Sequence, residues 1–336
     1  MRLARDGMTE NVVLFWRLAI TRLRQAFHTL IAVAILVGAA PAQAQAQAQA
    51  QDNDRLPVYI AGSGNITLDQ HIQSLLEEYL GNQLDLVFVS DEQAALTGNA
   101  PIVTIGPRAF SRVRQANRNA PVLAMLAAQD FLKGFATRSP GQVSGIYYDV
   151  PLLRQALIGK AILPQASRIA LISTTSSAEL YDTLIDQLPQ YGLKARLFVV
   201  DDDKQLIPTL TRALSYGDFL LAAPDSDIYN PRTIKYILLT AYRRNRIVIG
   251  PSQAYVKAGS LASGYAPFPE MARMTAGYLQ EFLKTGKFPE PDYPARFQVE
   301  INQQVARSLN IPLASSEEIT RAVELLLTNK RGQDDE

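Results

Sequence analysis

From residue 56 onward, short apolar runs alternate with amphipathic segments through most of the chain. An apolar run bounded by turn residues is typical of a buried strand, whereas apolar residues at three- and four-residue spacing indicate a helix. In the first half the pattern predicts strands at 56–61, 84–89, 101–105, 122–125 and 145–148. It predicts helices between them at 68–80, 91–96 and 110–117.

The same alternation continues in the second half of the chain. It predicts strands at 168–173, 195–200, 219–222 and 247–250, and helices at 151–162, 204–214 and 232–243. A further helix is predicted from the capping residues 174–177 to residue 188. After a stretch rich in small residues, it predicts helix 269–284, strand 297–301 and helices 303–309 and 316–327. Strands that alternate with helices in this way form parallel sheets covered by helices on both faces.

This order predicts an α/β fold of two doubly wound parallel-sheet lobes joined by hinge crossings. The predicted domains are 56–149 plus 263–295 for the first lobe, 150–262 plus 296–328 for the second, and a polar tail at 329–336. The small-residue stretch 254–264 and the segment 294–297 are the expected crossings, because the helix at 269–284 would return to the first lobe.

Residues 1–44 have the features of a secretory signal peptide. Arg17, Arg22 and Arg24 precede an apolar run at 30–40, and 42–44 offers a cleavage site with small residues. An uncleaved anchor is the alternative, because 12–16 is a second apolar patch, but the arginines interrupt any continuous span. We therefore expect a periplasmic protein with the signal peptide cleaved and an Ala/Gln linker at 45–55.

Composition limits the classes of function. The chain has 336 residues, 47% of them hydrophobic, which is enough apolar material for two folded lobes. The first 44 residues hold five Arg and two acidic residues, so the remainder carries 28 minus 30, or −2, and offers no basic field for nucleic acid. The lack of cysteine excludes a disulfide or a thiol nucleophile. The usual catalytic and phosphate-binding motifs are also missing, so we expect no enzyme activity, cofactor or metal.

Several short pieces carry a resemblance to a known family. They are Gly145–Tyr147, Leu163–Ile169, Ala223–Asp227, Val256–Ala262 and Ile301–Pro312. Over 56–312 the chain resembles the substrate-binding proteins of ABC transporters with a type I periplasmic binding fold, in particular the subgroup akin to aromatic amino acid (tryptophan/tyrosine) binders. The resemblance implies a small-molecule ligand and a membrane permease or other envelope protein as partner. The chain departs from the subgroup at 264–270, where a Gly-x-Asp element is usual, so the ligand stays open.

Candidate ligand-binding residues follow the predicted strands, because ligands of open parallel sheets bind outside the carboxyl ends of the strands. In the first lobe they are Ser63, Gly64, Gly106, Arg108 and Tyr147. Ser63 lies at a helix start, which favours an anion, and Arg108 can pair with a carboxylate. A solvated Arg108 is the alternative. Gly62 and Gly64 match half of a dinucleotide fingerprint, but the third glycine is replaced by Thr67, so a tight turn beside a small ligand is the alternative to nucleotide binding.

In the second lobe the candidates are Thr174, Thr175, Asp225, Asp227 and Ser252. The hydroxyls of 174–177 can reach a ligand or simply cap a helix. Asp225 follows a buried strand, where a carboxylate can bind an ammonium or hydroxyl group, although an Asp in such a loop also caps helices. On the ligand hypothesis, replacing Asp225 with Ala weakens ligand binding and leaves the stability of the free protein nearly unchanged.

These patterns predict an exported solute-binding protein that closes two lobes around a small polar or amphipathic ligand for an ABC-type import system. The alternative is a periplasmic regulatory or structural module of the same fold without a transported solute. A polar cleft of ligand size would favour the first, and a cleft filled with Tyr and Phe the second. An enzyme would need clustered titratable residues with perturbed pKa values.

Overall fold

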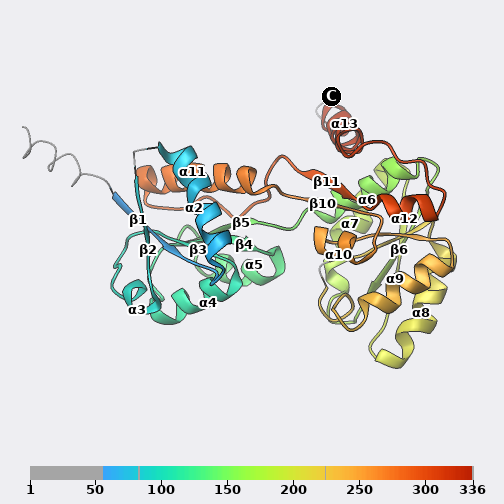
Figure 1. Cartoon of the computed structure of the whole chain (residues 1–336), viewed down its shortest axis with the longest axis horizontal. Coiled ribbons are helices and arrows are strands. Elements are labelled where there is room, and N and C mark those ends of the chain that lie inside the picture. Colours follow the sequence, from blue (N-terminus) through green and yellow to red (C-terminus); the bar gives the residue numbers. More distant parts are fainter. Residues whose placement is uncertain (1–55, 82–83, 224, 335–336) are drawn as a thin grey trace, which may run out of the picture. The chain divides into compact units, whose positions relative to one another are not determined.

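The computed structural model describes residues 56–81, 84–223 and 225–334, which form a five-stranded and a six-stranded sheet with their helices (Figure 1). We call each sheet and the helices packed on it a lobe. The predicted signal peptide at 1–44 and linker at 45–55 lie outside the described residues, as does Pro224.

The sheet of the first lobe has the strand order β2-β1-β3-β4-β5, and its described pairings are parallel. Its strands are β1 (Leu56–Ala61), β2 (Leu84–Phe88), β3 (Ile102–Ile105), β4 (Val122–Ala127) and β5 (Val143–Tyr147). Its helices are α2 (Ile66–Leu80), α3 (Asp91–Ala94), α4 (Pro107–Ala116), α5 (Gln129–Arg138) and α11 (Phe268–Thr285). Two hydrophobic cores line the two faces of this sheet. The first contains residues of α2 and α11, and the second contains Phe110 of α4 and Leu132 of α5, so helices cover both faces.

The sheet of the second lobe has the order β11-β10-β9-β8-β6-β7 and is parallel except for the pair β10–β11. Its strands are β6 (Arg168–Ser173), β7 (Lys194–Val199), β8 (Phe219–Leu221), β9 (Ile247–Ile249), β10 (Ala262–Tyr265) and β11 (Gln298–Ile301). Its helices are α6 (Leu152–Ile162), η2 (Ala178–Tyr181), α7 (Asp182–Gln187), η3 (Leu188–Tyr191), α8 (Asp203–Tyr216), α9 (Ile234–Arg243), α10 (Gln253–Ala258), α12 (Gln303–Ser308) and α13 (Ser316–Asp334). One core contains residues of α6, α7 and α13, and the other contains residues of α8 and α9. The predicted doubly wound α/β fold is therefore confirmed for both lobes.

The structure corrects the sequence analysis at three places. The stretch 254–264, predicted as a crossing, contains most of α10 and most of β10. Its small residues allow close packing, since an added Cβ on Gly264 would lie 3.1 Å from Ile158. Helix α5 had not been predicted. Helix α13 continues to Asp334, through most of the predicted polar tail.

Candidate functional site

Both sheets have a topological switch point, the place where consecutive strands turn in opposite directions along the sheet. In the first lobe it lies between β1 and β3, and in the second between β6 and β8. The crevice outside the carboxyl ends of strands at such a point is where open α/β sheets bind ligands. The loops after these four strands, together with the first turn of α4, hold most of the predicted site residues: Ser63, Gly64, Gly106, Arg108, Thr174, Thr175, Asp225 and Asp227.

The loop after β1 is held by Asp69 of α2, a residue that the sequence analysis did not identify. Its carboxylate accepts hydrogen bonds from the backbone N–H of Ser63 at 2.8 Å, from the Ser63 hydroxyl at 2.7 Å and from the N–H of Gly64 at 3.3 Å. A Cβ on Gly62 would lie 2.5 Å from that carboxylate, so a larger residue there would displace the Asp69 side chain. Asn65 caps α2 by accepting a hydrogen bond from the N–H of Leu68. Ser63 therefore donates its hydroxyl to Asp69, and Gly64 is the exposed part of the loop.

The loop after β3 begins at Gly106, which has a φ of 86° and precedes Pro107 at the first position of α4. Such a φ favours glycine, and Pro suits the first helical turn. Arg108 follows with an exposed side chain. One turn later, Arg112 donates from Nη2 to the carbonyl oxygen of Gly62 at 3.0 Å, which joins the ends of β1 and β3 across the switch point. The structure thus brings Ser63, Gly64 and Gly106 to one edge of the sheet.

Tyr147, the remaining first-lobe candidate, ends β5 in a buried aromatic and acidic cluster. Its ring packs against that of Tyr293, with centroids 4.8 Å apart. The hydroxyl of Tyr293 donates to Asp149, which also accepts from the backbone N–H of Gln129 at 3.3 Å. Burial raises the pKa of Asp149 to about 6 and that of Tyr147 to about 12. A buried carboxylate with a raised pKa marks a candidate site. Asp149 could not be identified from the sequence, because its raised pKa results from burial, which the sequence does not show.

Asp149→Asn is expected to raise the free energy of unfolding by roughly 2 kcal/mol near neutral pH and to change it little near pH 4. The pKa of Asp149 in the folded protein is about 6, above the ordinary 3.8. The folded protein therefore binds more protons than the unfolded chain in this window, and this contribution to stability falls as the pH rises through it. Asn is neutral at every pH, so the difference in the free energy of unfolding between Asp149→Asn and the original protein should grow as the pH rises from about 4 to 7.

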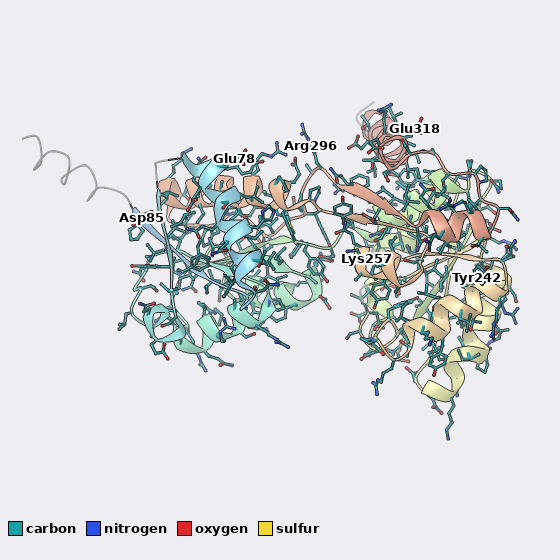
Figure 2. The ribbon with its side chains drawn as sticks, viewed as in Figure 1. Glu78, Asp85, Tyr242, Lys257, Arg296 and Glu318 are labelled. Atoms are coloured by element: carbon teal, nitrogen blue, oxygen red, sulfur yellow. The ribbon has the colours of Figure 1, made fainter. Side chains whose placement is uncertain are left out.

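Urea unfolding of both proteins from about pH 4 to pH 8 measures this difference. Asp85→Asn, a change at an exposed carboxylate of β2 (labelled in Figure 2), is the matched control. A constant difference between Asp149→Asn and the original protein over the whole range would contradict the assignment.

In the second lobe, the loop after β6 is anchored to the end of β7. Thr175 donates from its backbone N–H to Asp201 at 2.8 Å and from its hydroxyl at 2.7 Å, and these hydrogen bonds lower the pKa of Asp201. Thr174 donates its N–H to the hydroxyl oxygen of Ser177 at 3.0 Å. The hydroxyls of Thr174, Thr175 and Ser177 are thus engaged within the protein, although Ser177 at the start of η2 makes no side-chain capping hydrogen bond.

Asp225 lies in the loop after β8, is 4% exposed and has both carboxylate oxygens engaged. One oxygen accepts from the backbone N–H groups of Asp227 at 2.9 Å and Ile228 at 3.4 Å, and the other accepts from the Ser177 hydroxyl. Asp225 therefore joins the loops after β6 and β8. Asp227 is exposed beside Asp225, and no hydrogen bond of the described residues is accepted by its carboxylate. Ligand binding by Asp225, Asp227 and the other candidate residues stays a prediction.

A polar pocket of about 280 Å³ opens at this edge. Its polar lining consists of Thr174, Asp201, Asp202, Ser226, Asp227, Asn230, Arg232 and Thr233. Thr174 and Asp227 are thus brought to one cavity, whereas Asp225 lies beneath it. Ser252, the remaining second-lobe candidate, precedes α10 with a half-buried side chain that makes no capping hydrogen bond.

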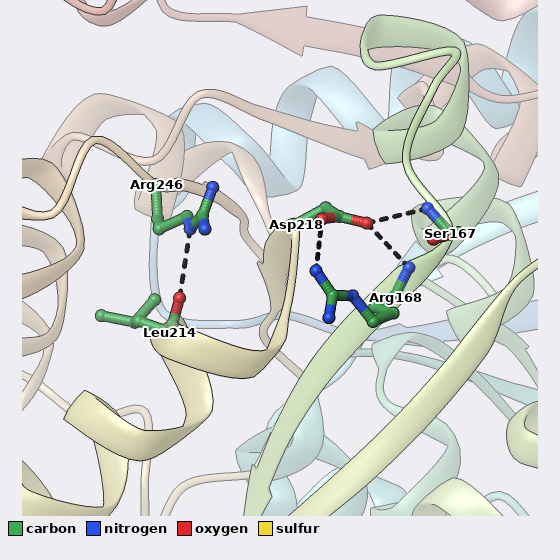
Figure 3. Close-up of polar contacts among 5 residues, drawn as sticks. All are labelled: Ser167, Arg168, Leu214, Asp218 and Arg246. Carbon is green, nitrogen blue, oxygen red and sulfur yellow. Dashed lines mark hydrogen bonds and ion pairs between the residues drawn. The ribbon is translucent and has the colours of Figure 1, made fainter.

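The opposite edge of this sheet has a second pocket, of about 260 Å³, at the amino ends of β6, β8 and β9. Figure 3 shows that Asp218 accepts hydrogen bonds from the N–H groups of Ser167 and Arg168 and pairs with the Arg168 guanidinium. Arg246 donates to the carbonyl oxygen of Leu214 at 3.1 Å. Although burial raises the pKa of Asp218, the N–H groups of 167 and 168 lower it overall. Through these contacts Asp218 holds the amino end of β6 to the amino end of β8.

No family model matches the sequence, and no curated protein matches it. Among solved structures, the ligand-free, open structure of a substrate-binding protein with adhesive properties from Clostridium difficile is 15% identical, with a TM-score of 0.63. The ABC domain from Streptococcus pneumoniae in complex with L-Trp is 19% identical, with a TM-score of 0.53. In both cases the match covers 78% of this chain and 97% of the other.

The chain has the type I substrate-binding fold. At these identities the likeness shows the fold alone. Within the described part of the chain, no helix combines the length and the apolar character needed to cross a bilayer. The same residues contain no cluster of three or more His, Asp or Glu side chains placed to hold a metal ion.

Proposed function

We propose that the chain is an exported solute-binding protein that captures a small polar or amphipathic ligand between its two lobes for an ABC-type import system. The observation that carries the proposal is that each sheet has a switch point with polar loops at its carboxyl edge. Two such edges can share one ligand when the lobes close, and the ligand then stabilises the closed state. A membrane permease is the expected partner.

The chemistry of the two edges favours a ligand with charges of both signs. The first-lobe edge carries the exposed Arg108, which can pair with a carboxylate. The second-lobe pocket carries Asp201, Asp202 and Asp227, which suit an ammonium group. A free amino acid has both groups. The resemblance to aromatic amino acid binders and the structural neighbour bound to L-Trp support an aromatic member of this class.

The test is native mass spectrometry of the protein purified from its expressing cell, followed by calorimetric titration. We expect a bound small molecule that is lost on denaturation, and binding of L-tryptophan or L-tyrosine in preference to a neutral sugar. Asp227→Asn should weaken that binding about tenfold, the scale of one charge-assisted hydrogen bond. Asp186→Asn, at an exposed position of α7 that does not line the pocket, is the matched control.

Two outcomes would count against this proposal. If no small molecule co-purifies and neither amino acids nor sugars bind, the module without a transported solute becomes the better hypothesis. If a solute binds but Asp227→Asn and Asp186→Asn behave alike, solute binding stands and the assignment of the second-lobe pocket is wrong.

A further inference from the structure

Helix α9 has two faces of different character. Its inner face, with Ile237, Leu238 and Ala241, is buried in the core that it shares with α8 and the second sheet. Its outer face exposes Lys235, Tyr236, Leu239, Tyr242 and Arg243, which follow one another at helical spacing. Tyr236 is 61% exposed, Leu239 41% and Tyr242 48% (Tyr242 is labelled in Figure 2). Large apolar and aromatic side chains that gather on one exposed face indicate an interaction surface.

The sequence around this helix carries charge of one sign, although the acidic Asp227 lines a pocket together with Arg232 and Tyr236. The sequence from 228 to 269 contains six Lys and Arg residues and no Asp or Glu, although the chain as a whole is nearly neutral. Four of these cations lie on or next to α9 and are exposed: Arg232, Lys235, Arg243 and Arg244. No hydrogen bond or ion pair joins their side chains to another side chain that the structure describes. The cations are therefore available to an external anion.

Stabilisation of the helix itself does not explain this pattern. A cation in the last turn, such as Arg243, interacts favourably with the helix dipole, but Lys235 in the first turn and Arg232 before it interact unfavourably. An ordinary solvated helix would mix acidic and basic side chains. The cations instead bracket the apolar residues at both ends of the helix.

The apolar surface continues from α9 onto α8. Ile207 of α8 is 42% exposed and lines a pocket of about 360 Å³ together with Tyr236 and Arg232. A helix face with Leu and Tyr in its centre and cations around it is the pattern of interfacial helices, whose aromatic rings lie at the lipid headgroups. Anionic lipids attract cations near the surface and need no complementary protein shape. These features favour a lipid surface over an acidic protein.

We propose that the outer face of α9, with Arg232, Lys235, Tyr236, Leu239, Tyr242, Arg243 and Arg244, binds the surface of a bilayer that contains anionic phospholipid. The apolar side chains enter the headgroup region, and the cations pair with lipid phosphates. This surface shares Arg232 with the polar pocket at the end of the sheet, but its other residues do not line that pocket, and the proposal does not depend on which solute the protein binds.

The test is co-sedimentation of the full-length protein with vesicles of phosphatidylcholine and phosphatidylglycerol, compared with vesicles of phosphatidylcholine alone. The triple variant Lys235→Glu, Arg243→Glu, Arg244→Glu should reduce the partition coefficient on anionic vesicles on the order of 100-fold, because each cation near the surface contributes about a factor of five. The control variant Arg118→Glu, Lys133→Glu, Lys284→Glu changes the net charge equally at exposed positions of the first lobe. It should bind like the original protein.

A local probe separates this face from binding through the N-terminal segment, which all variants share. Because the chain has no cysteine, Leu239→Cys can carry an environment-sensitive fluorophore, with Lys284→Cys as the control. We expect a blue shift with anionic vesicles at position 239 only, and its loss at high salt. Equal binding of the two triple variants, no response at position 239, or no binding to anionic vesicles would overturn the proposal. The last result would leave an acidic protein as the partner of this face.

Discussion

Gly217→Ala is expected to lower the free energy of unfolding by about 3 kcal/mol or more. Gly217 joins α8 to β8, and a Cβ at this position would lie 2.7 Å from the backbone nitrogen of Ala170, 2.8 Å from the Ala170 Cβ and 2.8 Å from the carbonyl oxygen of Phe219. Most of these atoms belong to the backbone of paired strands β6 and β8, so no rotation of a side chain relieves the overlap. The strands that form the switch point of the second lobe must separate instead.

Gly277→Ala is the matched control for this change. Gly277 lies in the middle of α11, is exposed, and has no atom within 4 Å of an added Cβ. Ala is a better helix former than Gly, so this variant should gain roughly 0.5 to 1 kcal/mol. Guanidinium unfolding of the two variants measures both effects. If Gly217→Ala were as stable as the original protein, the close contact between Gly217 and Ala170 of β6 would be contradicted.

The regular elements could be predicted from the sequence where local pattern and tertiary packing agree. Strands β1 and β6 begin and end where their apolar runs do, at Leu56–Ala61 and Arg168–Ser173. Helix α5 was not predicted because its sequence has weak helix signals. Gly134 interrupts its middle, and Ala128 before it makes no side-chain capping hydrogen bond. Its place is set by Leu132, which is buried against the sheet.

The small residues of 254–264 allow close packing of a strand on a helix, and composition alone does not distinguish this from a flexible connection. The stretch 254–264 has the composition of a flexible connection, yet β10 packs closely on α6. Gln155 of α6 accepts a hydrogen bond from the N–H of Gly264 at 2.8 Å and donates one to its carbonyl oxygen at 3.0 Å. Only a residue without a side chain lets helix and strand approach in this way.

The candidate site was predictable in position but not in its internal contacts. Parallel strand order alone places the loops at 62–64, 106–108, 174–177 and 225–227 at carboxyl edges of the sheets. The carboxylates that organise these loops could not be predicted, because their partners are distant along the chain. Asp201 binds Thr175 from 26 residues away, and Asp225 binds Ser177 from 48 residues away.

Asp225→Ala is expected to lower the free energy of unfolding by about 3 kcal/mol, a result that differs from the sequence-based expectation of nearly unchanged stability. The physical reason is that the buried carboxylate accepts hydrogen bonds from Ser177 and from the N–H groups of Asp227 and Ile228. Ala would leave these donors without their acceptor beneath the pocket, and each unsatisfied buried donor costs about 1 kcal/mol or more. The loops after β6 and β8 would then separate.

Asp225→Asn distinguishes this structural role from ligand binding. Its side-chain oxygen can still accept from the two N–H groups, and its NH₂ group can donate to the Ser177 hydroxyl, so the expected loss of stability is below about 1 kcal/mol. Thermal and urea unfolding of the ligand-free proteins should therefore rank Asn close to the original protein and Ala far below it. If Asp225→Ala instead kept its stability while calorimetric affinity for the solute fell, the carboxylate would be a ligand group, because only a partner outside the free protein would then have lost its hydrogen bond.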